Sequence, residues 1–85
     1  MGLEKMLDKL GDMLKPEASK KKNYRKKLKS LLKDLKHKEM KLKDKLEATD
    51  DERKRKRLQM ELEIVHSQRK KGIQALEAFI QANAD

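Results

Sequence analysis

The chain has 85 residues, of which 46% are charged and 35% hydrophobic, and its 24 basic and 15 acidic side chains give a net charge of +9. A chain of this length forms at most one domain. Its low content of apolar residues is too small to build a deep active-site cleft. Because the chain has no cysteine, disulfides, thiolate nucleophiles and sulfur-ligated zinc sites are also excluded. No apolar run is long enough to cross a membrane, and we expect a cytoplasmic protein.

The first predicted helix covers residues 3–15. Pro16 disfavours helical geometry in the residue before it, so the helix should end just ahead of this proline. Residues 16–23 are then a connector, in which Ser19 or Asn23 is available to cap the next helix. The leucines of the first helix share one face, since their spacings are four, three and four: Leu3, Leu7, Leu10 and Leu14.

The second predicted helix covers residues 24–47. Its apolar seam alternates intervals of four and three residues, as in the heptad repeat of a coiled coil. Helix-forming Lys, Leu and Glu fill most of the remaining positions. One seam position is charged, and the full set is Leu28, Leu32, Leu35, Glu39, Leu42 and Leu46.

A capping-box pattern predicts where the next helix begins. The Thr49 hydroxyl is available for the amide three residues on, and Glu52 is placed to reach back. We therefore expect a turn at residues 48–50 and a third helix over residues 51–82. Its seam has the same alternation, includes one Arg and one Gly, and comprises Leu58, Leu62, Val65, Arg69, Gly72, Leu76 and Phe79.

So short a link makes the two long helices antiparallel neighbours. A turn at Ala48 and Thr49 pairs positions whose numbers sum to about 97, which brings each seam position opposite another. In this register Gly72 lies opposite Arg25 and leaves room for a long side chain. Arg69 is either a polar residue that fixes the register or the frayed edge of the core. The seam pairs include Glu39 with Leu58, Leu35 with Leu62, Leu32 with Val65, and Leu28 with Arg69.

At the open end of the hairpin the apolar face is wider than a two-helix seam needs, because Tyr24, Leu31, Ile73 and Ile80 are added to it. A third helix should cover this extra surface, and the leucine face of residues 3–15 is the available one. The predicted fold is therefore all-α. It is an antiparallel, coiled-coil-like helical hairpin with a short N-terminal third helix packed at the open end, in a single domain of residues 1–85.

The basic excess is concentrated on residues 16–47, which carry thirteen basic and five acidic side chains. Lys and Arg neutralise phosphates and release counterions, so clustered basic residues indicate polyanion binding. We predict two such surfaces, placed by the inferred register. The arm run is Arg53, Lys54, Arg55, Lys56 and Arg57. The elbow cluster is Lys20, Lys21, Lys22, Arg25, Lys26 and Lys27, opposite Arg69, Lys70 and Lys71.

The expected function is that of a non-enzymatic basic helical-hairpin binding module that contacts nucleic-acid phosphates without sequence specificity. Only Tyr24 and Phe79 are able to stack on bases, and the core needs both. The alternative is a coiled-coil adaptor or assembly protein that docks on an acidic protein partner or forms a homodimer. A third interpretation is that the charged faces only keep a thin hairpin solvated, through pairs of opposite charge.

The sequence offers little for catalysis or metal binding. Its three glycines form neither a dinucleotide fingerprint nor a P-loop, and its serines lack partner residues. Glu63 with His66, and Asp34 with His37, have the carboxylate-x-x-His spacing of di-metal sites. On the inferred seams, however, these side chains point outward or only flank the interface. We therefore predict no catalytic residue, metal, cofactor or small-molecule substrate.

Overall fold

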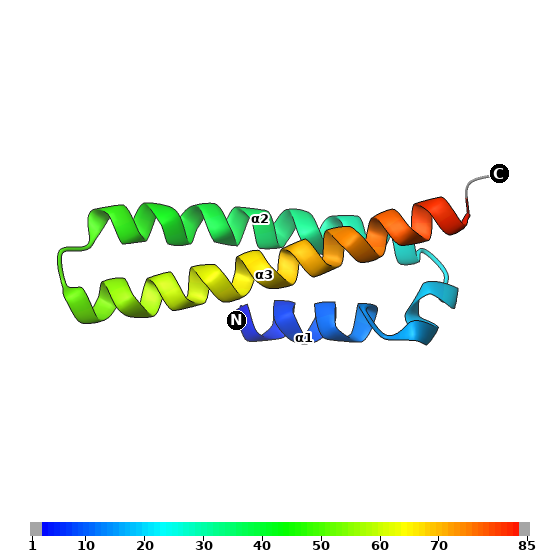
Figure 1. Cartoon of the computed structure of the whole chain (residues 1–85), viewed down its shortest axis with the longest axis horizontal. Helices are drawn as coiled ribbons and strands as arrows, with labels where there is room; N and C mark the ends of the chain where they lie inside the picture. Colours follow the sequence, from blue (N-terminus) through cyan, green and yellow to red (C-terminus); the bar gives the residue numbers. More distant parts are fainter. Residues whose placement is uncertain (1–2, 84–85) are drawn as a thin grey trace.

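The computed structural model describes residues 3–83 and contains four helical elements (Figure 1). α2 and α3 form a long antiparallel hairpin, and α1 packs along its open end in contact with both. The predicted all-α hairpin with a short N-terminal third helix is thereby confirmed. In chain order the elements are α1 (Leu3–Met13), the 3₁₀ helix η1 (Pro16–Lys20), α2 (Tyr24–Ala48) and α3 (Glu52–Ala82).

The connector between α1 and α2 contains a short helix that the sequence did not predict. Lys15 is extended, with φ −69° and ψ 146°, as a residue before proline prefers. Pro16 then takes the first position of η1, where its missing amide hydrogen leaves no helical hydrogen bond unmade. Ala18 is buried, so η1 closes the open end of the bundle rather than looping into solvent.

The start of α2 differs from the prediction, because neither candidate side chain caps it. Asn23 precedes α2 in a left-handed conformation, with φ 63°, and its side chain makes no capping hydrogen bond. The Ser19 hydroxyl donates instead to the carbonyl of Pro16, at 3.3 Å. Asn23 acts through its backbone: it tolerates the left-handed turn into α2, and its carbonyl accepts from the amide of Lys27 at 2.9 Å.

The start of α3 is capped by Asp51 and not by the predicted Thr49. The Asp51 carboxylate accepts from the amide of Arg53 at 2.9 Å, and its carbonyl accepts from the amide of Arg55. Asp is at least as good an N-cap as Thr, so the later start loses nothing in capping strength. The link between α2 and α3 therefore comprises residues 49–51, one residue further along than expected.

This difference gives a first prediction. Asp51→Ala should lower the free energy of unfolding by about 1 kcal/mol, because it removes the only side chain that accepts an amide of the first turn. Thr49→Ala should leave that free energy nearly unchanged, and Asp51→Asn should retain most of it. Urea unfolding of the three variants tests this. If Thr49→Ala and Asp51→Ala lower the free energy of unfolding equally, Thr49 also caps the helix, as the capping-box pattern predicted.

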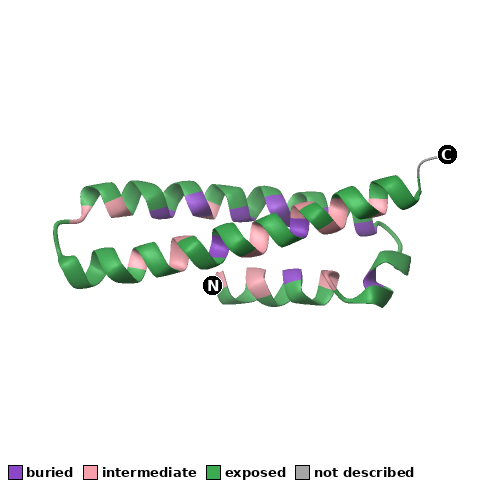
Figure 2. Cartoon of the chain, in the orientation of Figure 1, coloured by how far each residue is buried: buried purple, intermediate pink, exposed green. Residues whose placement is uncertain are grey.

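The hydrophobic core lies in the open half of the hairpin and draws mainly on α2 (Figure 2). Tyr24 is 5% exposed, its ring centroid is 4.8 Å from that of Phe79, and its hydroxyl donates to the carbonyl of Met13 at 3.3 Å. This burial raises the pKa of Tyr24. Ile80, which was expected to join the core, is 37% exposed. The buried hydrophobic residues are Leu10, Ala18, Tyr24, Leu28, Leu31, Leu32, Leu35, Leu42 and Val65.

Gly72 of α3 lies against side chains of both α1 and α2. A Cβ atom on Gly72 would lie 2.5 Å from Leu32 Cδ2 and 3.0 Å from Leu10 Cδ1. Leu32, which was predicted to lie opposite Val65, thus reaches seven residues further along α3. The predicted pairing of Gly72 with Arg25 is wrong, because α1 and α2 together fill the space that the missing side chain leaves.

A second contact shows the same displacement. Glu39 was predicted opposite Leu58, but its carboxylate binds His66 and Arg69. Arg69 is therefore not paired with Leu28 either. One cause of this shift is that the link lies one residue further along the chain than expected. The other is that helical side chains lean toward the N-terminus of their own helix, so that side chains of α2 lean toward the open end, where the later residues of α3 lie.

Candidate functional site

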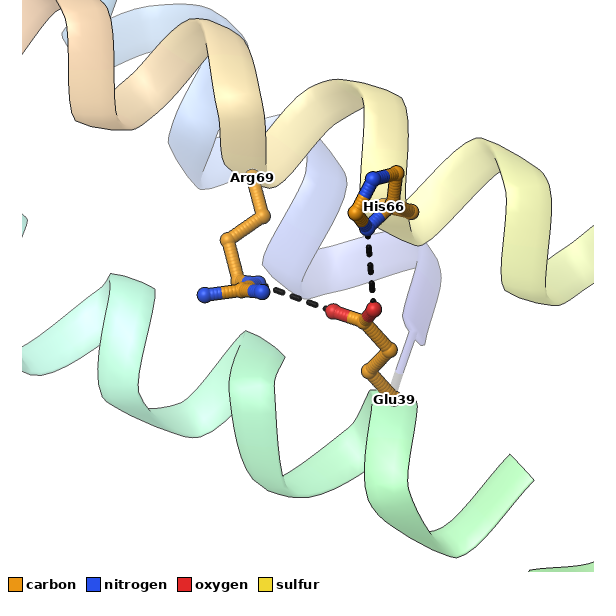
Figure 3. A network of polar contacts seen from close by, with 3 residues as sticks. All are labelled: Glu39, His66 and Arg69. Carbon is orange, nitrogen blue, oxygen red and sulfur yellow. Dashed lines mark hydrogen bonds and ion pairs between the residues drawn. The ribbon is translucent and has the colours of Figure 1, made fainter. Parts of the chain in front are cut away.

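One ionic network crosses the hairpin at its centre (Figure 3). Arg69 Nε donates to Glu39 Oε2 at 2.8 Å, and His66 Nδ1 lies 2.9 Å from Glu39 Oε1. An ionised carboxylate only accepts hydrogen bonds, so His66 Nδ1 is the donor. Burial by itself would raise the pKa of Glu39, but the hydrogen bonds from His66 and Arg69, together with the charge of Arg69, lower it.

Because of this network, Arg69 does not lie with the other residues of the predicted elbow cluster. Its side chain is 23% exposed and neutralises the only buried charged side chain among residues 3–83. It meets α2 at Glu39, twelve residues beyond Lys27, which is about 18 Å along a helix. Lys70 and Lys71 are exposed on α3. Arg69 thus links the two helices through Glu39 and lies apart from the rest of the predicted cluster.

Arg55 of the arm run also has a structural contact. Its Nη1 donates to the carbonyl of Leu46 at 2.9 Å and to that of Thr49 at 3.0 Å. These are backbone acceptors at the C-terminal end of α2, where a cation also interacts favourably with the helix dipole. Arg55 therefore fixes the link between the two long helices.

The rest of the arm run is divided among different faces of α3, because residues one or two apart on a helix do not share a face. Arg53 and Lys56 are exposed. Lys54 and Arg57 turn toward α2 and, with Lys45, line a hollow of about 350 Å³ at the closed end of the hairpin. We call this the tip hollow, and its lining is Lys45, Ala48, Thr49, Lys54, Arg57 and Leu58.

The remaining elbow residues surround the connector. All six basic residues between positions 20 and 27 are exposed. Three of them, with Lys9 of α1, rim an open groove of about 430 Å³ between α1, η1 and α2. We call this the connector groove. Its rim includes Lys9, Lys21, Lys22, Lys27, Asp12 and Asp34, and its floor is formed by Met13, Ala18, Tyr24 and Leu31.

A further basic surface lies on α2, and of its residues only Lys26 was among the predicted site residues. Five lysines on α2 are separated by three, four, three and seven residues, which places them along one face of the helix. From first to last they span seventeen residues, which is about 26 Å. The spacing is present in the sequence, but mixed with other charged residues it is a weaker signal than a consecutive basic run. We call it the α2 lysine face: Lys26, Lys29, Lys33, Lys36 and Lys43, all exposed.

Within residues 3–83, no helix is long and apolar enough to cross a membrane, and no group of three or more His, Cys, Asp or Glu side chains is placed to hold a metal ion. Glu63, Asp34 and His37 are exposed. Comparison of the chain with protein families, curated proteins and solved structures gives no match.

Proposed function

We propose that this chain is a non-enzymatic, basic helical-hairpin binding module that associates with the phosphate backbone of nucleic acid. The observation that carries the proposal is that most of its basic side chains form no ion pair. Among the Lys and Arg residues in the described part of the chain, only Lys15 and Arg69 lie within 4.0 Å of a carboxylate. Pairs of opposite charge therefore do not account for most of the 24 basic residues, and their charge is free to act on a ligand.

The shape of the molecule suits an extended polyanion. Its extents are 51 × 22 × 15 Å, and the α2 lysine face and the tip hollow lie along its long dimension. Duplex DNA rises by about 3.4 Å per base pair, so a contact along the rod would cover about fifteen base pairs. Tyr24 and Phe79 pack on each other in the core, which leaves phosphate contacts rather than base stacking as the source of affinity.

The salt dependence of binding tests this function. Six to eight phosphate contacts predict a slope of about −5 to −7 when the logarithm of the association constant is plotted against the logarithm of the salt concentration. The slope should be similar for duplexes of unrelated sequence, because phosphates carry no sequence information. Fluorescence anisotropy with labelled duplex DNA and RNA measures it. A slope near zero, or no binding at low salt, contradicts the proposal.

The α2 lysine face provides the matched variant for this measurement. Replacing Lys29, Lys33 and Lys36 with Gln should make the slope shallower by about 2 to 3, because each lost phosphate contact removes about 0.9. The control is Lys5→Gln, which removes an exposed charge from α1, whose sequence has two basic and three acidic residues. Circular dichroism should show unchanged helicity in both variants.

A second candidate function, docking of an acidic protein segment, is favoured by the connector groove. Four lysines and two aspartates surround an apolar floor there, and a phosphate backbone offers no apolar group to fill such a floor. An acidic peptide with one leucine would use both features. Its affinity should fall when the leucine is replaced by glycine, as calorimetry would measure. Equal affinities for the two peptides would contradict this candidate function, because binding would then depend only on nonspecific attraction between charges.

A further inference from the structure

The tip hollow brings together basic groups from three segments of the chain. Lys45 comes from the last turns of α2, Lys54 and Arg57 from the first turns of α3, and Thr49 from the link between them. No acidic residue is part of the lining. Of the nearby acids, Asp51 is engaged as the N-cap of α3, and those outside the lining that remain exposed are Asp44, Glu47, Asp50 and Glu52. The hollow is therefore a concave surface lined by one sign of charge, a shape that focuses the electrostatic potential.

The hollow is also held in place before any ligand arrives. Arg55 Nη1 donates to the carbonyls of Leu46 and Thr49, so the segment that carries the Thr49 hydroxyl is tied to α3. Ala48 and Leu58 add apolar atoms to the wall. Apolar walls lower the local dielectric constant and strengthen charged hydrogen bonds, while a fixed link avoids part of the ordering cost of binding.

The donor set matches a phosphate group. Lys45 and Lys54 each offer an ammonium, Arg57 offers a guanidinium that can donate two parallel hydrogen bonds, and Thr49 offers a hydroxyl. A phosphate group presents several acceptor oxygens in a compact tetrahedron, so donors carried by α2, the link and α3 can share it. A single helix face, by contrast, presents its donors in a line.

We propose that the tip hollow is a discrete site for one phosphate group of a nucleic-acid backbone, bound by Lys45, Lys54 and Arg57. This inference rests on the proposed function and deepens it, because it assigns one localised contact within an otherwise distributed surface. It also adds Lys45 and Thr49 to the predicted binding residues and makes Arg55 a positioning residue, which acts by holding the link in place.

Two triple variants separate a discrete site from a diffuse charge effect. The lining variant is Lys45→Gln with Lys54→Gln and Arg57→Gln. The control variant is Lys41→Gln with Arg53→Gln and Lys56→Gln, which removes three charges from the same end of the hairpin at exposed positions outside the lining. Inorganic phosphate is titrated at constant ionic strength and followed by amide chemical shifts of residues 45–58. Duplex DNA is titrated in parallel by anisotropy.

The wild type should show one saturable phosphate site. The lining variant should lose about tenfold or more in phosphate affinity, because three charge-assisted donors are removed, and the control variant should stay within about twofold of the wild type. The lining variant should also weaken duplex binding more than the control variant does.

Equal losses in the two variants would overturn the site in favour of a diffuse potential, as would the absence of a saturable phosphate site in the wild type. A steep salt slope on duplex would then still support the proposed function, so the two failures are distinguishable. Saturable phosphate binding without duplex binding would overturn the assignment of the site to nucleic acid.

Discussion

Arg69→Met is expected to lower the free energy of unfolding by about 3 kcal/mol, the lower end of the cost of removing one partner from a buried ion pair. Methionine keeps much of the apolar stem but leaves the Glu39 carboxylate, whose side chain is 7% exposed, with His66 alone. Urea unfolding at neutral pH measures the loss. The control is Lys70→Met on the neighbouring, exposed residue, which should change the free energy by less than about 0.5 kcal/mol.

A double variant tests whether the cost arises from the stranded carboxylate. Glu39→Leu combined with Arg69→Met replaces the ion pair with apolar groups of similar size, and this change is often neutral or stabilising. The double variant should therefore be more stable than Arg69→Met alone. If the two variants are equally unstable, the lost stability comes from the packing of the Arg69 stem and not from the charge of Glu39.

The same network makes stability depend on pH. The pKa of Glu39 is lowered in the folded state from its ordinary value of 4.5, so the unfolded chain takes up a proton at this residue more readily. The contribution of ionised Glu39 is fully present above pH 4.5 and is lost as the pH falls through the lower, folded pKa. The stability difference between wild type and Glu39→Gln should therefore shrink in acid. A difference that is constant from pH 7 to pH 3 would contradict this.

Gly72→Leu is expected to destabilise the protein by about 1–3 kcal/mol and to detach α1 from the hairpin. The Cβ atom alone would lie 2.5 Å from Leu32 and 3.0 Å from Leu10, so a whole leucine side chain cannot fit while α1 stays docked. α2 and α3 remain in contact along the arm, and the hairpin itself should persist. Amide hydrogen exchange should show a selective loss of protection in α1.

Gly11 provides the matched control for this substitution. It lies in α1, is exposed, and has nothing within 4 Å of the position where a Cβ would be. Leucine is a much better helix former than glycine, so Gly11→Leu should stabilise the protein by up to about 1 kcal/mol. The same substitution should thus have opposite effects at the two glycines. Similar effects would mean that helix propensity, and not the close approach at Gly72, decides the outcome.

Most of the fold was accessible from local patterns in the sequence. The seams at intervals of three and four identified the helices to within two residues at their ends, because the period of an α-helix is the same in any environment. The wider apolar face that includes Tyr24 and Leu31 located the third helix correctly, since both are buried at the open end. Competing local options were not separable in this way: Thr49 and Asp51 are both good N-caps, and only the structure distinguishes them.

The candidate site was predictable in composition but not in arrangement. The sequence identified Lys54 and Arg57 as candidate binding residues because they belong to a basic run. It did not place Lys45 beside them. It also counted Arg55 and Arg69 with the binding residues, although their side chains contact Thr49 and Glu39. Whether a basic side chain is free or engaged depends on which acceptors the neighbouring helix brings to it, and local periodicity carries no information about that.

The sequence by itself thus determined the helices, the faces they bury and the sign and amount of the charge. The tertiary structure decided the axial alignment of α2 and α3, the docking of α1 on Gly72, and the division of the basic residues into engaged and free ones. The physical reason is that a seam repeats every seven residues, so sliding one helix along the other by a repeat again places seam opposite seam. Specific contacts choose among these alignments, above all Glu39 with Arg69 and Gly72 with Leu32.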